Sequence, residues 1–486
     1  MLSSLMKQLI GGMKWTGSAT IINTGMQLLQ YVILGRLLAK SDFGLMGMVT
    51  VIIAFAQVFT DMGVGNAIVH RQNATHKQLS TLYWLNVFTG IGVAIIVFLS
   101  APLVAHFYSE PRLVELIHLI ALIFCIIPFG QQFQYLMQKN LEFDRIAKTE
   151  ITSVVLGVCL AIILAFAGVG VYSLVIGQIA FHATKSILYG LQGWSSFRPS
   201  FYFKLGEVKG FLSFGVYQMG SRSVSYFSSN IDYILIGRFL GAEALGIYTI
   251  AYQLVVVPVT KINPLITRVA FPLFAKVQNS NDSLSKGFTD MSKMLAVITF
   301  PILFGLMCTA DLLVPVMFGE KWTASIPLVQ ILSALGLLRV LMNPNGSILL
   351  AKGRADIGFK WDLGVASIHA IAFYLVVNMG IEAVAITYVL LALLNFLLGR
   401  ILLHHVIGLD GREYFRGLSK PAFFSVSMAV IVYAGYLLLS FIHFPTLIIP
   451  LSILILLGVI IYGALVFTFD KAYLVELKGS LKKKKV

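Results

Sequence analysis

Two hydrophobic stretches of the chain carry the same pattern of polar residues, which is the first indication of chemistry inside a membrane. The pattern repeats at an offset of 202 positions, and its members are Thr16, Thr20, Asn23, Gln27 and Gln30 in the first stretch and Gln218, Arg222, Ser225, Ser229 and Asp232 in the second. Steps of four and three residues place each set on one face of a helix. A polar face that avoids lipid must contact protein or a water-filled cavity. Paired repeats around such a cavity are typical of transporters.

Three basic residues within the hydrophobic stretches are the candidates for binding an anionic cargo. Arg222 and Arg339 lie near the middle of their stretches, and Lys261 lies toward the cytoplasmic half of its own. A charge at the centre of a bilayer costs at least about 2.5 kcal/mol, so each is a functional candidate. Arginine binds phosphate through two parallel hydrogen bonds and keeps its proton, which favours a phosphate-bearing cargo. In the alternative interpretation, these residues pair with neighbours and hold helices together.

The other members of the polar pattern complete the predicted site. We predict that a central cavity is lined by Thr20, Asn23, Gln27, Gln218, Ser225 and Ser229. Asp61 and Asp232 are candidates for coupling to H+ or Na+, with helix packing as the favoured alternative for both. Cys125, Cys159 and Cys308 have no paired spacing, and the sequence contains neither a P-loop nor a dinucleotide-binding motif. We therefore expect no metal site and no cofactor other than a coupling ion.

The composition indicates which elements must position these residues. Hydrophobic residues make up 58% of the 486 residues, charged residues make up 12%, and the mean hydropathy is +0.87. A helix of about 20 apolar residues crosses a hydrocarbon core of about 30 Å. Fourteen such spans are predicted, at residues 15–38, 44–69, 81–107, 113–138, 146–168, 171–194, 210–240, 242–266, 288–310, 325–351, 358–378, 381–404, 421–441 and 446–469. The sequence thus predicts an all-α polytopic membrane protein.

The basic residues test this count, because cytoplasmic loops of membrane proteins are enriched in Lys and Arg. With the N-terminus in the cytoplasm, 27 of the 36 Lys and Arg residues, Arg400 among them, fall in cytoplasmic segments and only five in outer loops. We therefore predict that both termini are cytoplasmic. The net charge of +15 is spread over these loops as an orientation signal, so it does not indicate nucleic-acid binding. The run at 482–485 is interpreted as an anchor to anionic lipid.

The domain organisation follows from the duplication. Residues 195–209 contain Arg198-Pro199 and a charged segment, and they lie where the sixth span ends and the second polar pattern begins. We interpret this segment as a cytoplasmic linker between two pseudo-symmetric six-helix lobes, at residues 1–194 and 210–407. Residues 408–486 hold the last two spans and a basic tail.

Several short motifs carry a resemblance to a known family. They are Ser80-Thr-Leu-Tyr-Trp-Leu-Asn86, Gly130-Gln-Gln-Phe-Gln134, Met137-Gln-Lys-Asn-Leu-Glu-Phe143, Asn263-Pro-Leu-Ile-Thr-Arg268, Phe271-Pro-Leu-Phe-Ala-Lys276, Phe318-Gly-Glu-Lys-Trp322 and Asn343-Pro-Asn-Gly346. Over nearly its whole length the chain resembles the Wzx-type oligosaccharide flippases of the multidrug/oligosaccharidyl-lipid/polysaccharide superfamily. It is most similar to the branch that exports colanic-acid-like and other exopolysaccharide repeat units.

The resemblance implies a function and a place in the cell. It implies a bacterial inner-membrane flippase that moves an undecaprenyl-diphosphate-linked oligosaccharide from the cytoplasmic to the periplasmic leaflet by alternating access. It also implies two six-helix lobes around a central cavity whose basic residues hold the diphosphate. The last two spans resemble helices that form a groove for the lipid tail in a related lipid II flippase. A polysaccharide polymerase and assembly proteins are the expected partners, and we expect the chain to act as a monomer.

Two other functions remain open at this point. An ion-coupled multidrug antiporter shares the fold of the superfamily, but a cationic drug favours carboxylates in the cavity, whereas the charges within these spans are mainly basic. A membrane glycosyltransferase or polymerase is the enzyme alternative. Such enzymes usually have a large outer loop, and the outer loops here are short. We therefore expect a transporter and no catalytic residues.

Overall fold

The computed structural model describes residues 2–61, 65, 68 and 73–469. Within this part, side chains are described except at 2–13, 61, 209–222, 224–225, 228, 257–258, 261–273, 275 and 355. All regular structure in the described residues is helical. Many of the helices are long and apolar enough to cross a membrane. The prediction of an all-α, multi-pass membrane protein is therefore confirmed.

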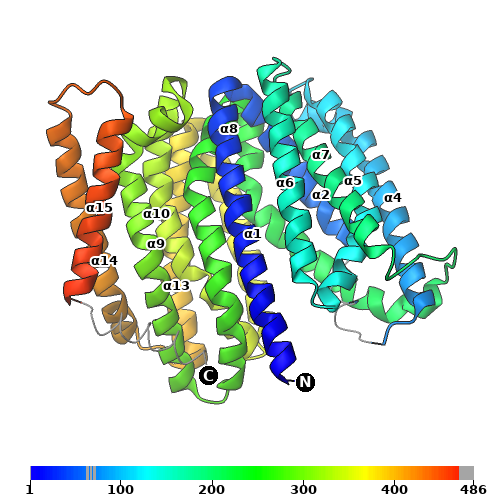
Figure 1. Ribbon diagram of the computed structural model, residues 1–486. Coiled ribbons are helices and arrows are strands. Elements are labelled where there is room, and N and C mark those ends of the chain that lie inside the picture. Colours follow the sequence, from blue (N-terminus) through cyan, green and yellow to red (C-terminus); the bar gives the residue numbers. More distant parts are fainter. Residues whose placement is uncertain (1, 62–64, 66–67, 69–72, 470–486) are drawn as a thin grey trace. The chain divides into compact units, whose positions relative to one another are not determined.

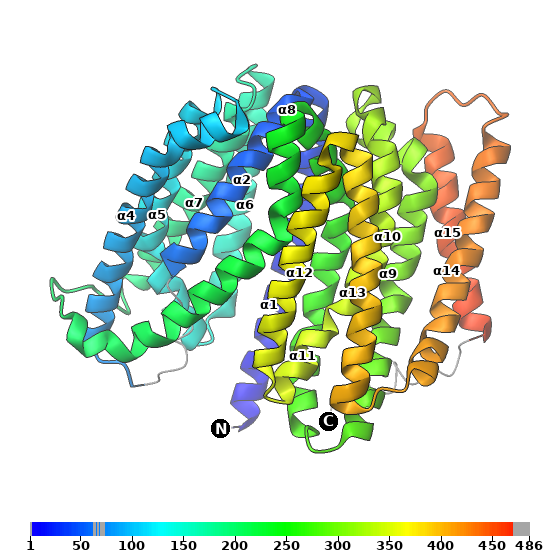
Figure 2. The same ribbon diagram turned by 180° about the vertical axis from the view of Figure 1, so that it is seen from behind.

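The chain forms two compact units, Met1–Thr249 with Asp362–Ile381 and Ile250–Trp361 with Glu382–Val486. Helices of the first unit are α1 (Leu2–Leu37), α2 (Lys40–Asp61), α4 (His76–Tyr108), α5 (Leu113–Lys139), α6 (Phe143–Phe166), α7 (Tyr172–Gly193), the 3-10 turn η1 (Leu205–Val208), the first part of α8 (Lys209–Lys276), most of α12 (Ala355–Val376) and η3 (Val377–Met379). In this unit α4, α5, α7, α6 and α1 pack side by side in that order (Figure 1, Figure 2).

The second unit is built around a long central helix. Its helices are the rest of α8, α9 (Asn281–Phe318), η2 (Glu320–Ser325), α10 (Ile326–Met342), α11 (Pro344–Ala351), α13 (Ile381–Ile407), α14 (Gly411–Leu439) and α15 (Ile448–Phe469). Helix α9 packs against α10, α14 and α15. It begins after Ser280, whose hydroxyl accepts a hydrogen bond from the Ser283 amide, and α14 begins in the same way after Asp410. These caps satisfy backbone amides that the first turn of a helix leaves free.

Helix α8 is two helices that reverse at Gly241. This glycine has φ of 82° and ψ of −177°, a conformation that is nearly restricted to glycine. The Tyr248 hydroxyl donates to the Asp232 carboxylate at 2.7 Å, although the two residues would lie about 24 Å apart along a straight helix. The chain must therefore fold back between them. The break lies between the predicted spans 210–240 and 242–266.

Each of the fourteen predicted spans overlaps a helix. By length and composition, eleven candidate spans occur among the residues that the structure describes, and α1 and α7 are outside this set. Both helices carry many polar residues, which lower their hydropathy. The exact number of spans stays a prediction. The two lobes inferred from the duplication also stay a prediction, because units defined by packing need not coincide with units of sequence repetition.

Candidate functional site

A cavity of about 410 Å3 lies within the first unit, among α2, α5 and α7. Its wall is formed by Ala54, Gln57, Val58, Thr60, Ile127, Gly130, Gln131, Gln134, Tyr135, His182, Lys185, Ser186 and Tyr189. These residues lie between the middle and the C-terminal end of each of the three helices. Because all three helices are predicted to run from the outer side to the cytoplasm, the cavity belongs to the half of the unit that is predicted to be cytoplasmic.

Lys185 on α7 is the cation of this cavity. Its ammonium nitrogen lies 5.9 Å from the ring centre of Phe181 and 5.8 Å from that of Tyr189, so two aromatic faces flank the charge. Among the described residues, no carboxylate forms an ion pair with Lys185. The carboxylate of Glu150 on α6 acts on the charge of Lys185 from beyond ion-pair distance, and a charge removed from water without a directly paired counterion is costly. The cavity is therefore suited to an anionic ligand.

The motif Gly130–Gln134 forms one wall of the cavity from α5. Gly130 allows close packing on α7, because a Cβ atom at this position would lie 2.4 Å from the Cα atom of Ser186. Gln131 donates to the Tyr135 hydroxyl at 2.8 Å, and both side chains line the cavity. Gln132 is directed elsewhere and donates to the Leu79 carbonyl. The motif thus combines a helix contact with hydrogen-bonding groups on the cavity wall.

The Tyr189 hydroxyl adds an unused hydrogen-bonding group. Tyr189 is buried, and its hydroxyl has no hydrogen-bond partner among the described residues. A buried hydroxyl without a partner is uncommon and usually indicates a water or ligand nearby. The centre of the Tyr189 ring lies 5.8 Å from the ammonium nitrogen of Lys185. A phosphate oxygen accepts hydrogen bonds of the kind that each of these two groups can donate.

The polar pattern of α1 is directed into the same unit. Gln27 and Gln30 line a smaller cavity of about 90 Å3, whose other walls come from α6 and α7. Thr20 donates back to the Thr16 carbonyl at 2.9 Å, and Asn23 is half-buried. Two residues of the polar pattern, Gln27 and Gln30, thus face a cavity within the first unit. The role of the pattern in binding cargo stays a prediction.

Arg339 on α10 lies in the second unit, where it joins three helices. Its guanidinium donates to the hydroxyl of Tyr252 at 2.5 Å and to that of Tyr388. The centres of these two rings lie 5.4 and 5.0 Å from the guanidinium carbon. These contacts fit the helix-fastening interpretation of Arg339, and contact with cargo stays a prediction.

Other predicted site residues fall in two groups. Asp232 is buried and accepts from Tyr248 between the two halves of α8, while Ser229 is exposed. The remaining side chains lie outside the described part of the structure, and they are Asp61, Gln218, Arg222, Ser225 and Lys261. The roles of both groups in cargo binding or ion coupling stay predictions.

Comparison with known proteins adds the family. Residues 33–327 match the family described as "Polysaccharide biosynthesis protein". The chain belongs to this family. It is 43% identical to the teichuronic acid biosynthesis protein TuaB of Bacillus subtilis (strain 168), over 88% of this chain and 89% of TuaB. It is 37% identical to the lipopolysaccharide biosynthesis protein WzxC of Escherichia coli (strain K12), over 89% of this chain and 88% of WzxC.

The fold of this polysaccharide biosynthesis protein also has relatives among solved structures. The lipid II flippase MurJ, in an inward closed conformation, superposes with a TM-score of 0.76 over 96% of this chain and 100% of that chain, at 13% identity. An inward-facing multidrug resistance MATE family transporter of the MOP superfamily superposes with a TM-score of 0.62 over 79% and 95%, at 16% identity. At such identities these likenesses establish the fold. The family match and the similarity to TuaB and WzxC confirm the resemblance to Wzx-type flippases.

Two cations of this polysaccharide biosynthesis protein have surroundings that the sequence did not indicate. Lys185 lies within the predicted span 171–194 but is not among the predicted site residues, although His182 and Gln178 precede it at helical spacing on the same helix. Arg400 was counted as a cytoplasmic orientation signal. In the structure Arg400 is buried in the second unit, where its guanidinium carbon lies 4.8 to 4.9 Å from the ring centres of Phe288, Phe396 and Tyr414.

Proposed function

We propose that the protein is a flippase for undecaprenyl-diphosphate-linked oligosaccharide repeat units. It moves them from the cytoplasmic to the periplasmic leaflet by alternating access. The relatives support this proposal, because two proteins named for teichuronic acid and lipopolysaccharide biosynthesis match nearly the whole chain. The fold is that of a lipid II flippase. A transporter, and not a glycosyltransferase or polymerase, fits these relatives.

The single observation that carries the proposal at the level of residues is the cation of Lys185 inside a cavity on the predicted cytoplasmic side. A diphosphate is the negatively charged group of such a cargo. One charge pair about 4 Å apart contributes about 4 kcal/mol at an effective dielectric constant of about 20. Lys185 attracts this group and would repel a cationic drug, which argues against the multidrug antiporter. Arg222, Lys261 and Arg339 are proposed as further basic contacts.

Several finer statements belong to the same proposal. The protein resides in the bacterial inner membrane with both termini in the cytoplasm, which the distribution of Lys and Arg supports. It works as a monomer beside a polysaccharide polymerase and assembly proteins. Coupling to H+ or Na+ through Asp61 or Asp232 would supply energy, and no other cofactor is needed.

Transport of a labelled cargo tests the proposal. The purified protein is reconstituted into vesicles with a fluorescent undecaprenyl-diphosphate oligosaccharide, and an impermeant quencher measures how fast the label changes leaflet. We expect Lys185→Met to lower the rate at least tenfold at subsaturating cargo, because the charge is lost. Lys185→Arg should retain measurable transport. The matched control is Lys286→Met, which removes an exposed cation at the start of α9.

Two results would contradict the proposal at different levels. If the folded wild-type protein moves the cargo no faster than protein-free vesicles do, the flippase function is wrong. If the wild type is active and Lys185→Met is equally active, the function stands and the assignment of Lys185 is wrong.

A further inference from the structure

Residues 195–208 of the linker, here called the strap, pack along the first turns of α4 in the first unit (Figure 2). The indole nitrogen of Trp84 donates to the Ser200 carbonyl at 2.9 Å. The backbone amide and the hydroxyl of Ser200 both contact the Ser80 hydroxyl, at 3.1 and 3.0 Å. The Lys204 amide reaches the Thr81 hydroxyl at 3.4 Å. The strap is thus an ordered part of this unit.

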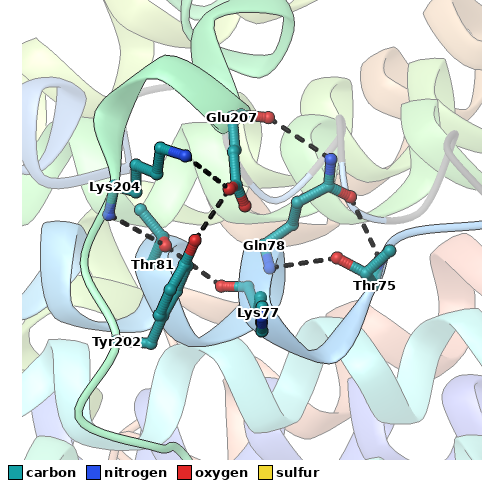
Figure 3. Close-up of polar contacts among 7 residues, drawn as sticks. All are labelled: Thr75, Lys77, Gln78, Thr81, Tyr202, Lys204 and Glu207. Atoms are coloured by element: carbon teal, nitrogen blue, oxygen red, sulfur yellow. Dashed lines mark hydrogen bonds and ion pairs between the residues drawn. The ribbon is translucent and has the colours of Figure 1, made fainter.

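A second set of contacts holds the C-terminal end of the strap in place (Figure 3). The Glu207 carboxylate accepts from the Tyr202 hydroxyl at 2.7 Å and pairs with Lys204 at 3.4 Å. The hydrogen bond from Tyr202 and the nearby charge of Lys204 lower the pKa of the Glu207 carboxyl, so it is ionised at neutral pH. The Glu207 carbonyl accepts from Gln78, which also forms a capping box with Thr75 at the start of α4.

The near end of the strap is anchored by a buried ring. Phe197 lies in a hydrophobic cluster with Tyr83, Phe133 and Tyr189, and Tyr189 also lines the cavity that contains Lys185. The strap therefore has one end beside the cavity wall and the other on the first turn of α4. Its position relative to α4 is fixed at both ends.

The outward face of the strap is aromatic and uncovered. Phe201 is 96% exposed and stacks on Trp84 with ring centres 5.2 Å apart. Phe203 is half-exposed and contacts Phe88 edge-on at 5.6 Å. This surface continues along one face of α4 through exposed apolar residues, which are Ile91, Ile95, Leu99 and Leu103. Such a face is suited to lipid, and full exposure of these rings to water would be unfavourable.

The depth of the strap matches the edge of the membrane. The predicted span of α4 begins at residue 81, so Trp84 and Phe88 lie about 5 and 10 Å inside that edge. Aromatic side chains are enriched at this level. Beside them, the side chains of Lys77, Arg198 and Lys204 are exposed, and Lys77 lies 5.3 Å from the ring centre of Tyr202. Three cations against the single carboxylate of Glu207 give this surface a positive charge.

We propose that the strap is a binding surface for anionic phospholipid headgroups of the cytoplasmic leaflet. Phe201 and Phe203 lie among the headgroups and upper acyl chains, and Lys77 and Lys204 contact lipid phosphate. Binding of lipid at the strap would not require bound cargo, and it is a property separate from transport. Through Phe197 and Tyr189, it connects the membrane surface to the wall of the cavity.

Lipid-dependent quenching tests this proposal. A bimane label is attached to Phe201→Cys in a protein without its three native cysteines. The labelled protein is studied in nanodiscs of phosphatidylcholine that contain a minor fraction of phosphatidylglycerol. In one sample the phosphatidylcholine is brominated, and in the other the phosphatidylglycerol is. We expect both brominated lipids to quench the label, with a preference for phosphatidylglycerol of about fivefold for each contributing lysine. Lys77→Gln and Lys204→Gln should each reduce that preference, whereas Lys286→Gln should leave it unchanged.

Two labelled positions serve as references for the measurement. Phe88→Cys, on the exposed face of α4, should be quenched, and Gln278→Cys, on the exposed loop after α8, should not. A label at residue 201 that behaves like the one at residue 278 would show that water or another protein covers the strap, and this would overturn the proposal. Equal quenching by the two lipids in every variant would overturn the assignment of anionic headgroups.

Discussion

A close contact between α2 and the second half of α8 gives a quantitative prediction for the stability of the first unit. A Cβ atom on Gly44 would lie 1.7 Å from the Ala242 carbonyl oxygen and 2.5 Å from its carbon. An ordinary contact requires about 3.5 Å, so the atoms are about 1.8 Å too close. The obstacle is backbone, which cannot rotate away as a side chain can. Gly44→Ala must therefore separate the two helices.

The expected cost can be estimated from similar cases. Overpacking by one methyl group usually costs about 1–3 kcal/mol, and a rigid backbone obstacle places Gly44→Ala at about 3 kcal/mol. For a unit of this size, each kcal/mol lowers Tm by about 2–4 °C, which predicts a decrease of about 6–12 °C. The matched control is Gly92→Ala in α4, where nothing lies within 4 Å of the new Cβ atom. There the better helix propensity of alanine should stabilise by about 0.5–1 kcal/mol.

Thermal unfolding of the purified protein in detergent measures both variants. Scans with and without a fluorescent conformational probe on α2 would show whether the loss of stability begins in the first unit. If Gly44→Ala melts within about 1 °C of the parent protein while Gly92→Ala behaves as expected, the close approach of α2 to α8 is wrong.

Three further predictions concern charge and topology. Arg400→Ala should lower the free energy of unfolding by about 3 kcal/mol, because buried cation–π contacts and a hydrogen bond are lost. A melting curve like that of the parent protein would show that Arg400 does not stabilise the second unit. Arg222→Ala should abolish polymer export in cells at normal protein abundance, with partial rescue by Arg222→Lys, and full export by an abundant alanine variant would refute the diphosphate contact. In a cysteine-free background, Lys321→Cys should react with an impermeant maleimide from the periplasm, and Gly411→Cys should not. Labelling of residue 411 in intact cells would contradict the predicted topology.

The sequence was sufficient to predict the helices but not the faces they share. Runs of apolar residues locate the spans because any helix that crosses lipid must satisfy its backbone internally and cover itself with apolar side chains. The reversal at Gly241 can also be predicted from the sequence, because the apolar run there is too long for one span. The residues that pack against one another across helices cannot be predicted in this way. The wall opposite Lys185 comes from residues near 57 and 131, and nothing in the local sequence around Lys185 specifies them.

Arg400 illustrates a second limit of sequence-based prediction. A basic residue near the cytoplasmic end of a helix has the same sequence context whether its side chain extends to water or turns inward. The distinction depends on three rings, two of them on other helices, and on the side-chain amide oxygen of Asn345, which accepts a hydrogen bond from the guanidinium. Such contacts are set by tertiary packing. The charge count therefore predicts an orientation, but it does not predict whether an individual basic side chain is buried.

A lysine in the cavity of the first unit is compatible with transport, because a transporter must both bind and release its cargo. A transporter must release its cargo, so a site that held the diphosphate equally tightly in every conformation would stop the cycle. Arginine offers a planar fork that matches phosphate with two hydrogen bonds, whereas lysine is a compact, strongly hydrated point charge. In the role proposed for it, Lys185 would attract a diphosphate over several ångströms without fixing its orientation. Tyr189, which lines the same cavity, shares a hydrophobic cluster with Phe197 of the strap. The proposed cargo site and the proposed lipid-binding surface are therefore joined through one packed cluster.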